Sequence, residues 1–367
     1  MTAKLRVKTA MSNATPDRVP LIPQICHPHA IRYFGLDFEQ TILDCLRNPE
    51  RVNLLQFECA KAYGVDGVRA WIPAEPVDVV QIDGVWHGRD PQSGEIRGVV
   101  DFRGGGWIIL PEGPQLVTEQ DIAGIPVRLA HEIFGDGTLD SIREIVERAG
   151  DELFVISAPE SFTLEFLTFQ RGKQQALMDI IERPDFCHRA MERALTGAIQ
   201  TTLALAKIGI DGIKISDTFG GVIGPELFRE FCLPYFQRFV HAVTAELGAQ
   251  RPRIYLHICG NSSCILELMA DTGVDCIEPL DYVAGVEVAD AKRRVGNRVA
   301  LMGGVSTIEL AHGSLTAVTA DIQRCLDQGT PGGGYLLACA DMLPTETAPE
   351  KVNAMVEAAH KHVYAHG

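Results

Sequence analysis

Short apolar runs that alternate with longer amphipathic stretches constrain the fold of this 367-residue chain more than any other feature. Runs such as FVISAP (154–159) and RVALMG (298–303) are almost continuously apolar, which is typical of strands buried on both faces of a parallel sheet. Such runs occur at 19–24, 65–70, 154–159, 212–217, 253–259, 276–280, 298–303 and 334–339. Eight strands alternating with helices predict a single (β/α)8 TIM barrel domain over residues 1–367, and an open doubly wound sheet is the alternative.

The stretches between the runs carry helical patterns. We expect helices at 225–247, at 314–329 with Ser314 as the N-cap, and at 349–366 with a proline in the first turn. Residues 77–113 break this rhythm, because they combine alternating apolar and polar residues with turn sequences such as IDG and RGGG. This pattern predicts an antiparallel hairpin insertion, which either extends the barrel mouth or only decorates the surface.

Composition excludes several classes of partner. The net charge of −15 repels phosphate backbones, so we expect no nucleic-acid partner. No apolar run approaches the ~18 residues needed to span a bilayer, and the first 20 residues lack the apolar core of a secretory signal. We therefore expect a cytoplasmic protein without a membrane partner, whose ten cysteines are mostly reduced and buried.

The segment RIYLHICGN (253–261) carries the strongest chemical signal. His257 and Cys259 are two residues apart at the end of a predicted strand, so both side chains point to the same face. Cys339 also ends a predicted strand, and the carboxyl ends of barrel strands meet at one mouth. An imidazole and two thiolates form a three-ligand zinc site with one open position, which is the catalytic pattern. The alternative is that some or all of these side chains are ordinary core residues.

Four segments together resemble one known family: 211–236, 257–275, 293–305 and 336–359. They are similar to the uroporphyrinogen decarboxylase superfamily, and more narrowly to its zinc-containing, corrinoid-dependent methyltransferase branch. The similarity is good over about residues 200–360, and in the first 200 residues it extends only to the general pattern of the strands. It implies a zinc ion, a corrinoid (cobalamin) as co-substrate, a small-molecule methyl donor or acceptor, and a small corrinoid protein as a possible partner.

Two departures from the decarboxylases bear on activity. The stretch PQICHPHAIRYFG (23–35) keeps Arg32 but lacks the arginine-rich motif by which those enzymes grip substrate carboxylates. In RAWIPAEP (69–76), Trp71 and Ile72 stand where an acid is expected. Both differences argue against porphyrinogen decarboxylation and leave the substrate of a methyltransferase unassigned.

Two acids are candidate catalytic residues. The resemblance implies an acid at Asp217, which ends the predicted strand GIKISD and would contact the substrate or support another site residue. Glu278 lies near a strand end and could orient a zinc-bound histidine through its other ring nitrogen, or serve as a transient fourth ligand. For Asp217 the alternative is a turn or N-cap residue, and for Glu278 a capped or solvated acid.

Five further residues are candidates for binding the substrate. His27 and His29 follow the first predicted strand, and Asn261 follows the ligand pair, although an asparagine there could simply be a turn residue. Arg32 and Arg69 could bind an anionic substrate, since a guanidinium matches a carboxylate or sulfonate, or could form surface ion pairs.

The sequence thus predicts a zinc-dependent enzyme that moves a methyl group between a corrinoid and a thiol or a methoxy or methylthio substrate. The corrinoid must come from outside the sequence at hand, because no D-x-H-x-x-G cobalamin-binding pattern occurs in it. A metal-free lyase of the decarboxylase type is one alternative. A non-catalytic barrel with a structural zinc or a partner-binding role is the other.

Overall fold

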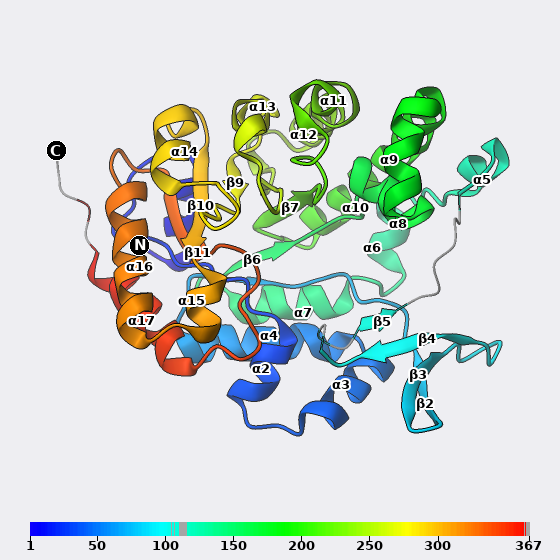
Figure 1. Ribbon diagram of the computed structural model, residues 1–367, viewed down its shortest axis with the longest axis horizontal. Coiled ribbons are helices and arrows are strands. Elements are labelled where there is room, and N and C mark those ends of the chain that lie inside the picture. The colour runs from blue at the N-terminus through cyan, green and yellow to red at the C-terminus, as the bar shows by residue number, and fades with distance from the viewer. Residues whose placement is uncertain (104, 106, 110–115, 363, 365–367) are drawn as a thin grey trace.

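A curled parallel sheet lies at the centre of the molecule, which is a computed structural model describing residues 1–103, 105, 107–109, 116–362 and 364 (Figure 1). Over these residues the sheet has seven strands in the order β1-β6-β7-β8-β9-β10-β11. The strands are β1 (Gly67–Arg69), β6 (Phe154–Ser157), β7 (Gly212–Ser216), β8 (Arg253–His257), β9 (Cys276–Glu278), β10 (Ala300–Val305) and β11 (Tyr335–Cys339). Each coincides with one of the predicted runs, so the α/β, TIM-barrel-like prediction is confirmed for these seven.

The remaining run, 19–24, lies between the last and the first strand without forming a regular strand. The Ile22 amide donates to the Leu337 carbonyl at 3.0 Å, and the Leu21 carbonyl accepts from the Asp66 amide at 2.8 Å. Only isolated parallel bridges result, Leu21 with Leu337 and Gln24 with Met342. Proline has no N–H to donate, so Pro20 and Pro23 interrupt the hydrogen bonding that a full strand would make.

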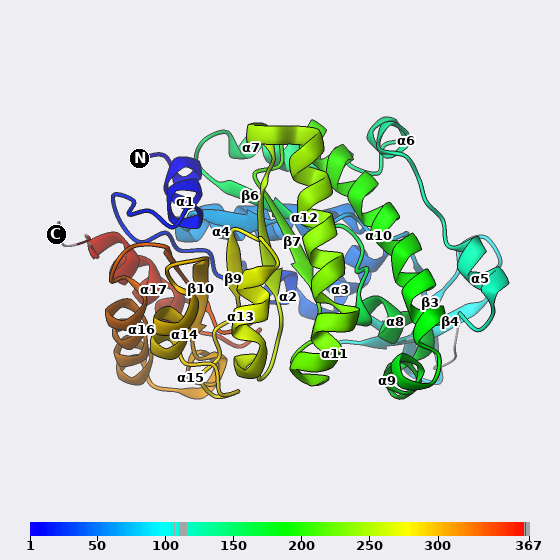
Figure 2. The same cartoon turned by 90° about the horizontal axis from the view of Figure 1, so that it is seen from above.

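Helices surround the curled sheet, as Figures 1 and 2 show. They are α1 (Ala3–Met11), α2 (His27–Tyr33), α3 (Phe38–Arg47), α4 (Glu50–Tyr63), α5 (Glu119–Gly124), α6 (Ala130–Gly135), α7 (Asp140–Ala149), α8 (Leu164–Arg171), α9 (Lys173–Glu182), α10 (Pro184–Lys207), α11 (Gly224–Phe231), α12 (Leu233–Leu247), α13 (Leu266–Asp271), α14 (Val288–Val295), α15 (Thr307–His312), α16 (Leu315–Gly329) and α17 (Pro349–Lys361), with 3-10 turns at Gly248–Gln250 and Ser263–Ile265. No helix in the described part of the chain is long and apolar enough to cross a membrane.

The predicted helices are confirmed with different ends. Ser314 caps α16 as expected, because its side chain accepts from the Ala317 amide. The predicted helix 225–247 is two helices that meet at Cys232, where Pro234 cannot donate to the preceding turn. The helix predicted at 349–366 ends at Lys361. Residues 363, 365 and 366 of that prediction lie outside the described residues.

The predicted insertion is an antiparallel sheet of four strands, β2 (Asp78–Ile82), β3 (Val85–Arg89), β4 (Ile96–Asp101) and β5 (Trp107–Ile109). Asp83 and Gly84 connect β2 to β3 and both have positive φ, at 49° and 81°, as a two-residue Asp-Gly hairpin requires. The Trp86 indole donates to Glu39 of α3 at 2.7 Å, which fixes the insertion beside that helix (Figure 1). Residues 104, 106 and 110–113 of the predicted insertion fall outside the description.

One end of the curled sheet is closed by α1. Val7, Ala10 and Met11 pack into the inner cluster of the sheet with residues such as Phe154 and Tyr255. On the same helix, Lys4 and Arg6 form ion pairs with Asp211 and Asp66, which directly precede β7 and β1. The helix therefore covers the amino ends of the strands, so that an active site belongs at the opposite, carboxyl ends.

Candidate metal centre

Three potential metal ligands meet at the carboxyl ends of the strands. His257 ends β8, Cys259 follows it, and Asp341 lies in the loop after β11, with ligand atoms that are all within 4.8 Å of one another. The His257 Nε2 atom lies 2.9 Å from the Cys259 Sγ and 3.9 Å from a carboxylate oxygen of Asp341. An imidazole, a thiolate and a carboxylate are all ligands that zinc accepts, so these residues fit a three-ligand zinc site.

Glu278 at the end of β9 orients the histidine. Its carboxylate lies 2.8 Å from the His257 Nδ1 and accepts from the Arg69 guanidinium at 2.6 Å, and all three side chains are buried. Although burial opposes ionisation, Arg69 and His257 hold the pKa of Glu278 at about 2. A carboxylate there favours the tautomer with the proton on Nδ1, which leaves the Nε2 lone pair directed at Cys259 and Asp341. Glu278 thus makes the contact that the orienting role requires, and the role itself stays a prediction.

Cys339 does not belong to this group of three. Cys339 is fully buried and its thiol lies close enough to Arg69 and Glu278 for their charges to act on it, but its sulfur is not among the ligand atoms that lie within 4.8 Å of one another. Asp341, two residues further on, brings its carboxylate to the group instead. The geometry therefore favours Asp341 as the third ligand, and a ligand role for Cys339 stays a prediction.

Burial raises the pKa of both thiols, Cys259 and Cys339. Burial raises the pKa of Cys339 to about 12, with Arg69 opposing the shift. Burial, reinforced by Asp341, likewise raises the pKa of Cys259 to about 12, although Lys214 opposes it. A cation at the group would be needed to hold Cys259 as a thiolate near neutral pH.

Sequence reasoning missed Lys214 and Glu165, which lie beside the group. Lys214 of β7 places its ammonium 5.5 Å from the Trp71 ring centroid, and burial lowers its pKa. Glu165 of α8 accepts from the hydroxyls of Ser161, Ser216 and Thr218 at 2.6 to 2.7 Å. A lysine inside the apolar run GIKIS was the available signal for Lys214. Glu165 carried no comparable signal in the sequence.

Asp217 holds the turn after β7 and does not belong to the metal-ligand group. Its carboxylate accepts from the Phe219 amide at 3.0 Å, and its own amide donates to the His257 carbonyl at 3.1 Å. Burial raises the pKa of Asp217 to about 6. These contacts are those of the turn residue considered as the alternative, and a catalytic role for Asp217 stays a prediction.

The remaining candidates also lie outside the group of three. His29 contacts the Tyr63 hydroxyl at 3.0 Å, and burial lowers the pKa values of His27 and His29 to about 4. Arg32 is exposed above the Phe38 ring. Asn261 accepts from the Ser263 amide at 3.1 Å within its own loop. Substrate contacts by these residues stay predictions, as they do for Arg69, which is paired with Glu278.

Comparison with known proteins places the chain among decarboxylase-like barrels. The uroporphyrinogen decarboxylase (URO-D) family matches residues 110–362. Uroporphyrinogen decarboxylase of Thioalkalivibrio sulfidiphilus is 36% identical over 153 residues, 42% of each chain. That of Photorhabdus laumondii is 28% identical over 227 residues, 60% of this chain and 63% of the relative. The chain spans about half the length of most of these curated relatives.

A solved structure matches over nearly the full length. A methyltransferase from Methanosarcina mazei superposes with a TM-score of 0.72 and 20% sequence identity, covering 98% of this chain and 99% of that one. At this identity the match shows a shared fold.

Proposed function

The chain belongs to the uroporphyrinogen decarboxylase (URO-D) family, and from that premise we propose that it is a zinc-dependent methyltransferase. It moves a methyl group between a corrinoid and a thiol or a methoxy or methylthio substrate. One observation carries this proposal: Glu278 holds the His257 ring so that Nε2 faces Cys259 and Asp341. A buried carboxylate, an imidazole and two further ligands are the pattern of a zinc site, and three ligands leave one position for a substrate.

Charge balance supports the same assignment. The Cys259 thiolate and the Asp341 carboxylate together would neutralise a divalent cation. A zinc ion bound there would lower the pKa of a substrate thiol and leave its sulfur nucleophilic. Glu278 keeps the proton on Nδ1 and is itself kept ionised by Arg69, so the ring stays fixed while substrates exchange.

The methyl group is transferred as the equivalent of a methyl cation, so the atom that loses it keeps the bonding electron pair. With a thiol acceptor, the sulfur–carbon bond forms as the cobalt–carbon bond breaks, cobalt keeps the electron pair, and the thiol proton passes to solvent. With a methoxy or methylthio donor, reduced cobalt takes the methyl group and the oxygen or sulfur leaves with the electron pair. The corrinoid would reach the carboxyl ends of the strands from outside, free or carried by a small corrinoid protein.

Metal analysis tests the centre and identifies its third ligand. We expect about one zinc per wild-type chain and loss of that zinc in Cys259→Ala. Comparing Asp341→Ala with Cys339→Ala separates the two candidates for the third ligand, and we expect the larger loss of zinc in Asp341→Ala. A zinc-free wild-type chain that retains full activity would contradict the proposal.

A direct assay tests the transfer. Purified chain mixed with methylcobalamin and 2-mercaptoethanol should demethylate the corrinoid, which is followed by the visible spectrum of methylcobalamin. Cys259→Ala should lose this activity together with its zinc. Activity that is unchanged in Cys259→Ala would count against zinc-dependent transfer.

A second candidate is a metal-free lyase of the decarboxylase type. The relatives named uroporphyrinogen decarboxylase favour it, at up to 36% identity over part of the chain. This candidate predicts a chain without stoichiometric zinc, and a lyase activity that is indifferent to Cys259→Ala.

A further inference from the structure

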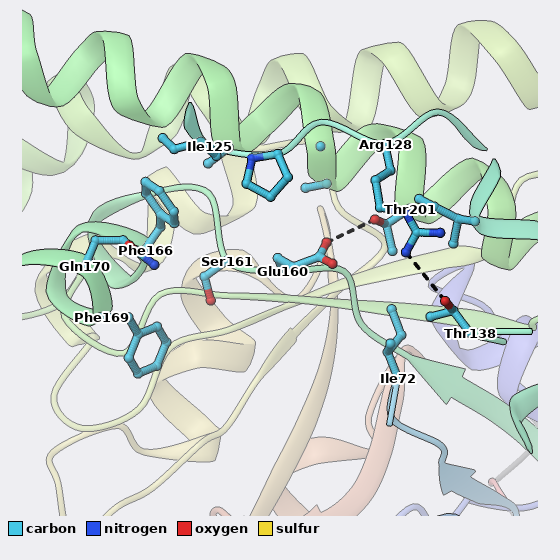
Figure 3. A pocket seen from close by; sticks show the side chains of 15 residues that line it. Ile72, Ile125, Arg128, Thr138, Glu160, Ser161, Phe166, Phe169, Gln170 and Thr201 are labelled. Atoms are coloured by element: carbon cyan, nitrogen blue, oxygen red, sulfur yellow. Dashed lines mark hydrogen bonds between the residues drawn. The ribbon is translucent and has the colours of Figure 1, made fainter. Parts of the chain in front are cut away.

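A cavity of about 480 Å³ is lined by none of the residues of the metal-ligand group (Figure 3). Its walls come from α8, from α10, from segment 125–138 with α6, and from the loops that follow β1 and β6. A volume of this size is within the range of pockets that bind small molecules.

The cavity has an apolar end and a polar end. Figure 3 shows Phe166 and Phe169 of α8 together on one side and Arg128 and Thr138 on the other, with Glu160 between them. Phe169 leaves 68% of its surface exposed although it is a large aromatic side chain. Exposed aromatic rings at the rim of a cavity are typical of binding sites for rings.

Charge within the cavity is not balanced. The Glu160 carboxylate accepts from the Thr201 hydroxyl at 3.0 Å, and it forms no ion pair with any residue that the structure describes. The cationic group nearby, Arg128, is already paired with Asp136. The pocket therefore offers a free acceptor to a ligand and opposes anions, in keeping with the net charge of −15.

Position ties the cavity to the metal centre. Ile72 follows the end of β1 and Ser161 follows the end of β6, so the cavity opens at the same carboxyl edge as His257. The Ser161 hydroxyl donates to Glu165, which also accepts from Ser216. Ser216 is the register partner of His257 across β7 and β8. A continuous set of contacts thus joins the cavity wall to the strand that carries the metal ligand.

We propose that this cavity binds the body of the methyl-group substrate, an aromatic molecule with a hydrogen-bond donor or a cationic group directed at Glu160. The ring packs against Phe166 and Phe169, the donor meets the Glu160 carboxylate, and an anionic ring compound is rejected. This inference rests on the proposed function for the ligand's role as substrate, whereas occupation of the cavity is measurable without any transfer.

Three probes of similar size test the chemistry. Benzylamine, phenol and benzoate carry a cationic, a neutral and an anionic group on the same ring, and their binding to the full chain is measured by calorimetry. We expect saturable binding of benzylamine and phenol and none of benzoate. Glu160→Gln should weaken benzylamine binding about tenfold and phenol binding less, because the ionised acceptor is lost. Stronger binding of benzylamine than of phenol would identify a cationic ligand, and the reverse order a neutral one.

A pair of variants on α10 tests whether the probes bind in this cavity. Gly197 lines the cavity, and a Cβ there would have the Pro126 carbonyl at 3.9 Å as its nearest contact, so Gly197→Leu has room to fold and fills the cavity. Leucine is also a better helix former than glycine. Thr196→Leu adds the same side chain one residue earlier, where the helix is exposed. We expect Gly197→Leu to abolish benzylamine binding and Thr196→Leu to leave it unchanged.

The outcomes separate this inference from the proposed function. A chain that holds zinc but binds none of the probes, binds benzoate as tightly as benzylamine, or binds benzylamine equally well after Gly197→Leu overturns the cavity assignment alone. A zinc-free chain that still binds benzylamine in the cavity overturns the proposed function and supports the binding site.

Discussion

Two buried clusters of arginine and carboxylate lie at opposite ends of the sheet, and they differ in whether their hydrogen bonds are complete. At the amino ends, Asp66 accepts from Arg6 at 2.7 Å, from Arg18 at 2.7 and 2.9 Å, and from the Leu21 amide at 2.9 Å. Its two oxygens are thus fully used, and they join α1 and segment 19–24 to β1.

At the carboxyl ends the comparable carboxylate, Glu278, serves a different purpose. It holds Arg69 and His257, while the Arg69 Nη1 is buried without a partner among the described residues. The His257 Nε2 faces two further potential ligands. A complete network stabilises the fold, whereas an incomplete one with aligned ligand atoms indicates a site for something else.

The largest effect is expected at the amino ends. Asp66→Ala removes the carboxylate and leaves Arg6 and Arg18 without their buried partner, so the free energy of unfolding should fall by about 4 kcal/mol. Urea denaturation measures this change. Asp17→Ala is the matched control, because Asp17 pairs with the same Arg6 from a side chain that is 37% exposed, and its loss should cost about 1 kcal/mol or less. Equal effects of the two variants would remove the distinction between a buried and an exposed partner.

Glu278→Gln should weaken metal binding in addition to removing the charge that faces the buried Arg69 guanidinium. The amide cannot hold the Nδ1 proton of His257 as a carboxylate does, so zinc affinity should fall about 10- to 100-fold. Competition with a chelator measures the affinity. Glu267→Gln, which removes a surface partner of Arg294, is the control and should leave zinc affinity unchanged. An unchanged affinity in Glu278→Gln would mean that the carboxyl-end cluster is structural, like the one at Asp66.

Glu165 offers an intermediate case, a buried carboxylate held by hydroxyl groups. Burial opposes its ionisation, but hydrogen bonds from Ser161, Thr218 and Ser216 lower its pKa. A folded-state pKa below the unfolded value of about 4.3 gives stability that is present above that pH and is lost as the pH falls through the folded value. Glu165→Gln should therefore cost about 1 to 2 kcal/mol at pH 7, and the difference from wild type should shrink in acid. Denaturation midpoints at pH 7 and below pH 4 check this, and a difference that grows in acid would contradict it.

The smallest effect is expected at Cys264, an exposed free cysteine five residues after Cys259. Cys264→Ser should change the free energy of unfolding by no more than about 0.5 kcal/mol, and should leave the zinc content at the wild-type value. Loss of zinc in this variant would show that the centre extends beyond His257, Cys259 and Asp341.

The sheet could be predicted because its strands are buried on both faces, and such strands are continuous apolar runs. Hydrophobic patterns failed to predict the extent of elements that depend on backbone hydrogen bonding. Segment 19–24 is apolar enough to read as a strand, but Pro20 and Pro23 limit it to two bridges. A continuous helical pattern spans 225–247, but the helix is interrupted at Cys232 because Pro234 cannot donate a backbone hydrogen bond.

Only part of the candidate site could be predicted from the sequence, because most of its contacts join residues that are far apart in the chain. His257 and Cys259 are two residues apart, so their common face follows from strand geometry alone. The contact between Arg69 and Glu278 joins residues 209 positions apart, which no local pattern encodes. Asp341 lies in a loop after a strand, where aspartates commonly occur as turn or surface residues, so no pattern in the sequence indicated it as a ligand. Cys339 was the predicted ligand because a thiolate binds zinc well. Alternation along β11 cannot separate Cys339 from Asp341, because they are two residues apart, so which side chain reaches the histidine depends on the course of the chain after the strand ends at Cys339.

The two bridges of segment 19–24 also have a consequence for motion. Opening of a folded protein begins where backbone hydrogen bonds are few, and this seam between β11 and β1 has fewer of them than a full strand would supply. Beside the seam, Met342 pairs with Gln24, and the preceding residue is Asp341. A cation held jointly by Asp341 and β8 would fasten one side of the seam, so the amide hydrogens of Ile22 and Leu343 should exchange with solvent more slowly once the metal is bound.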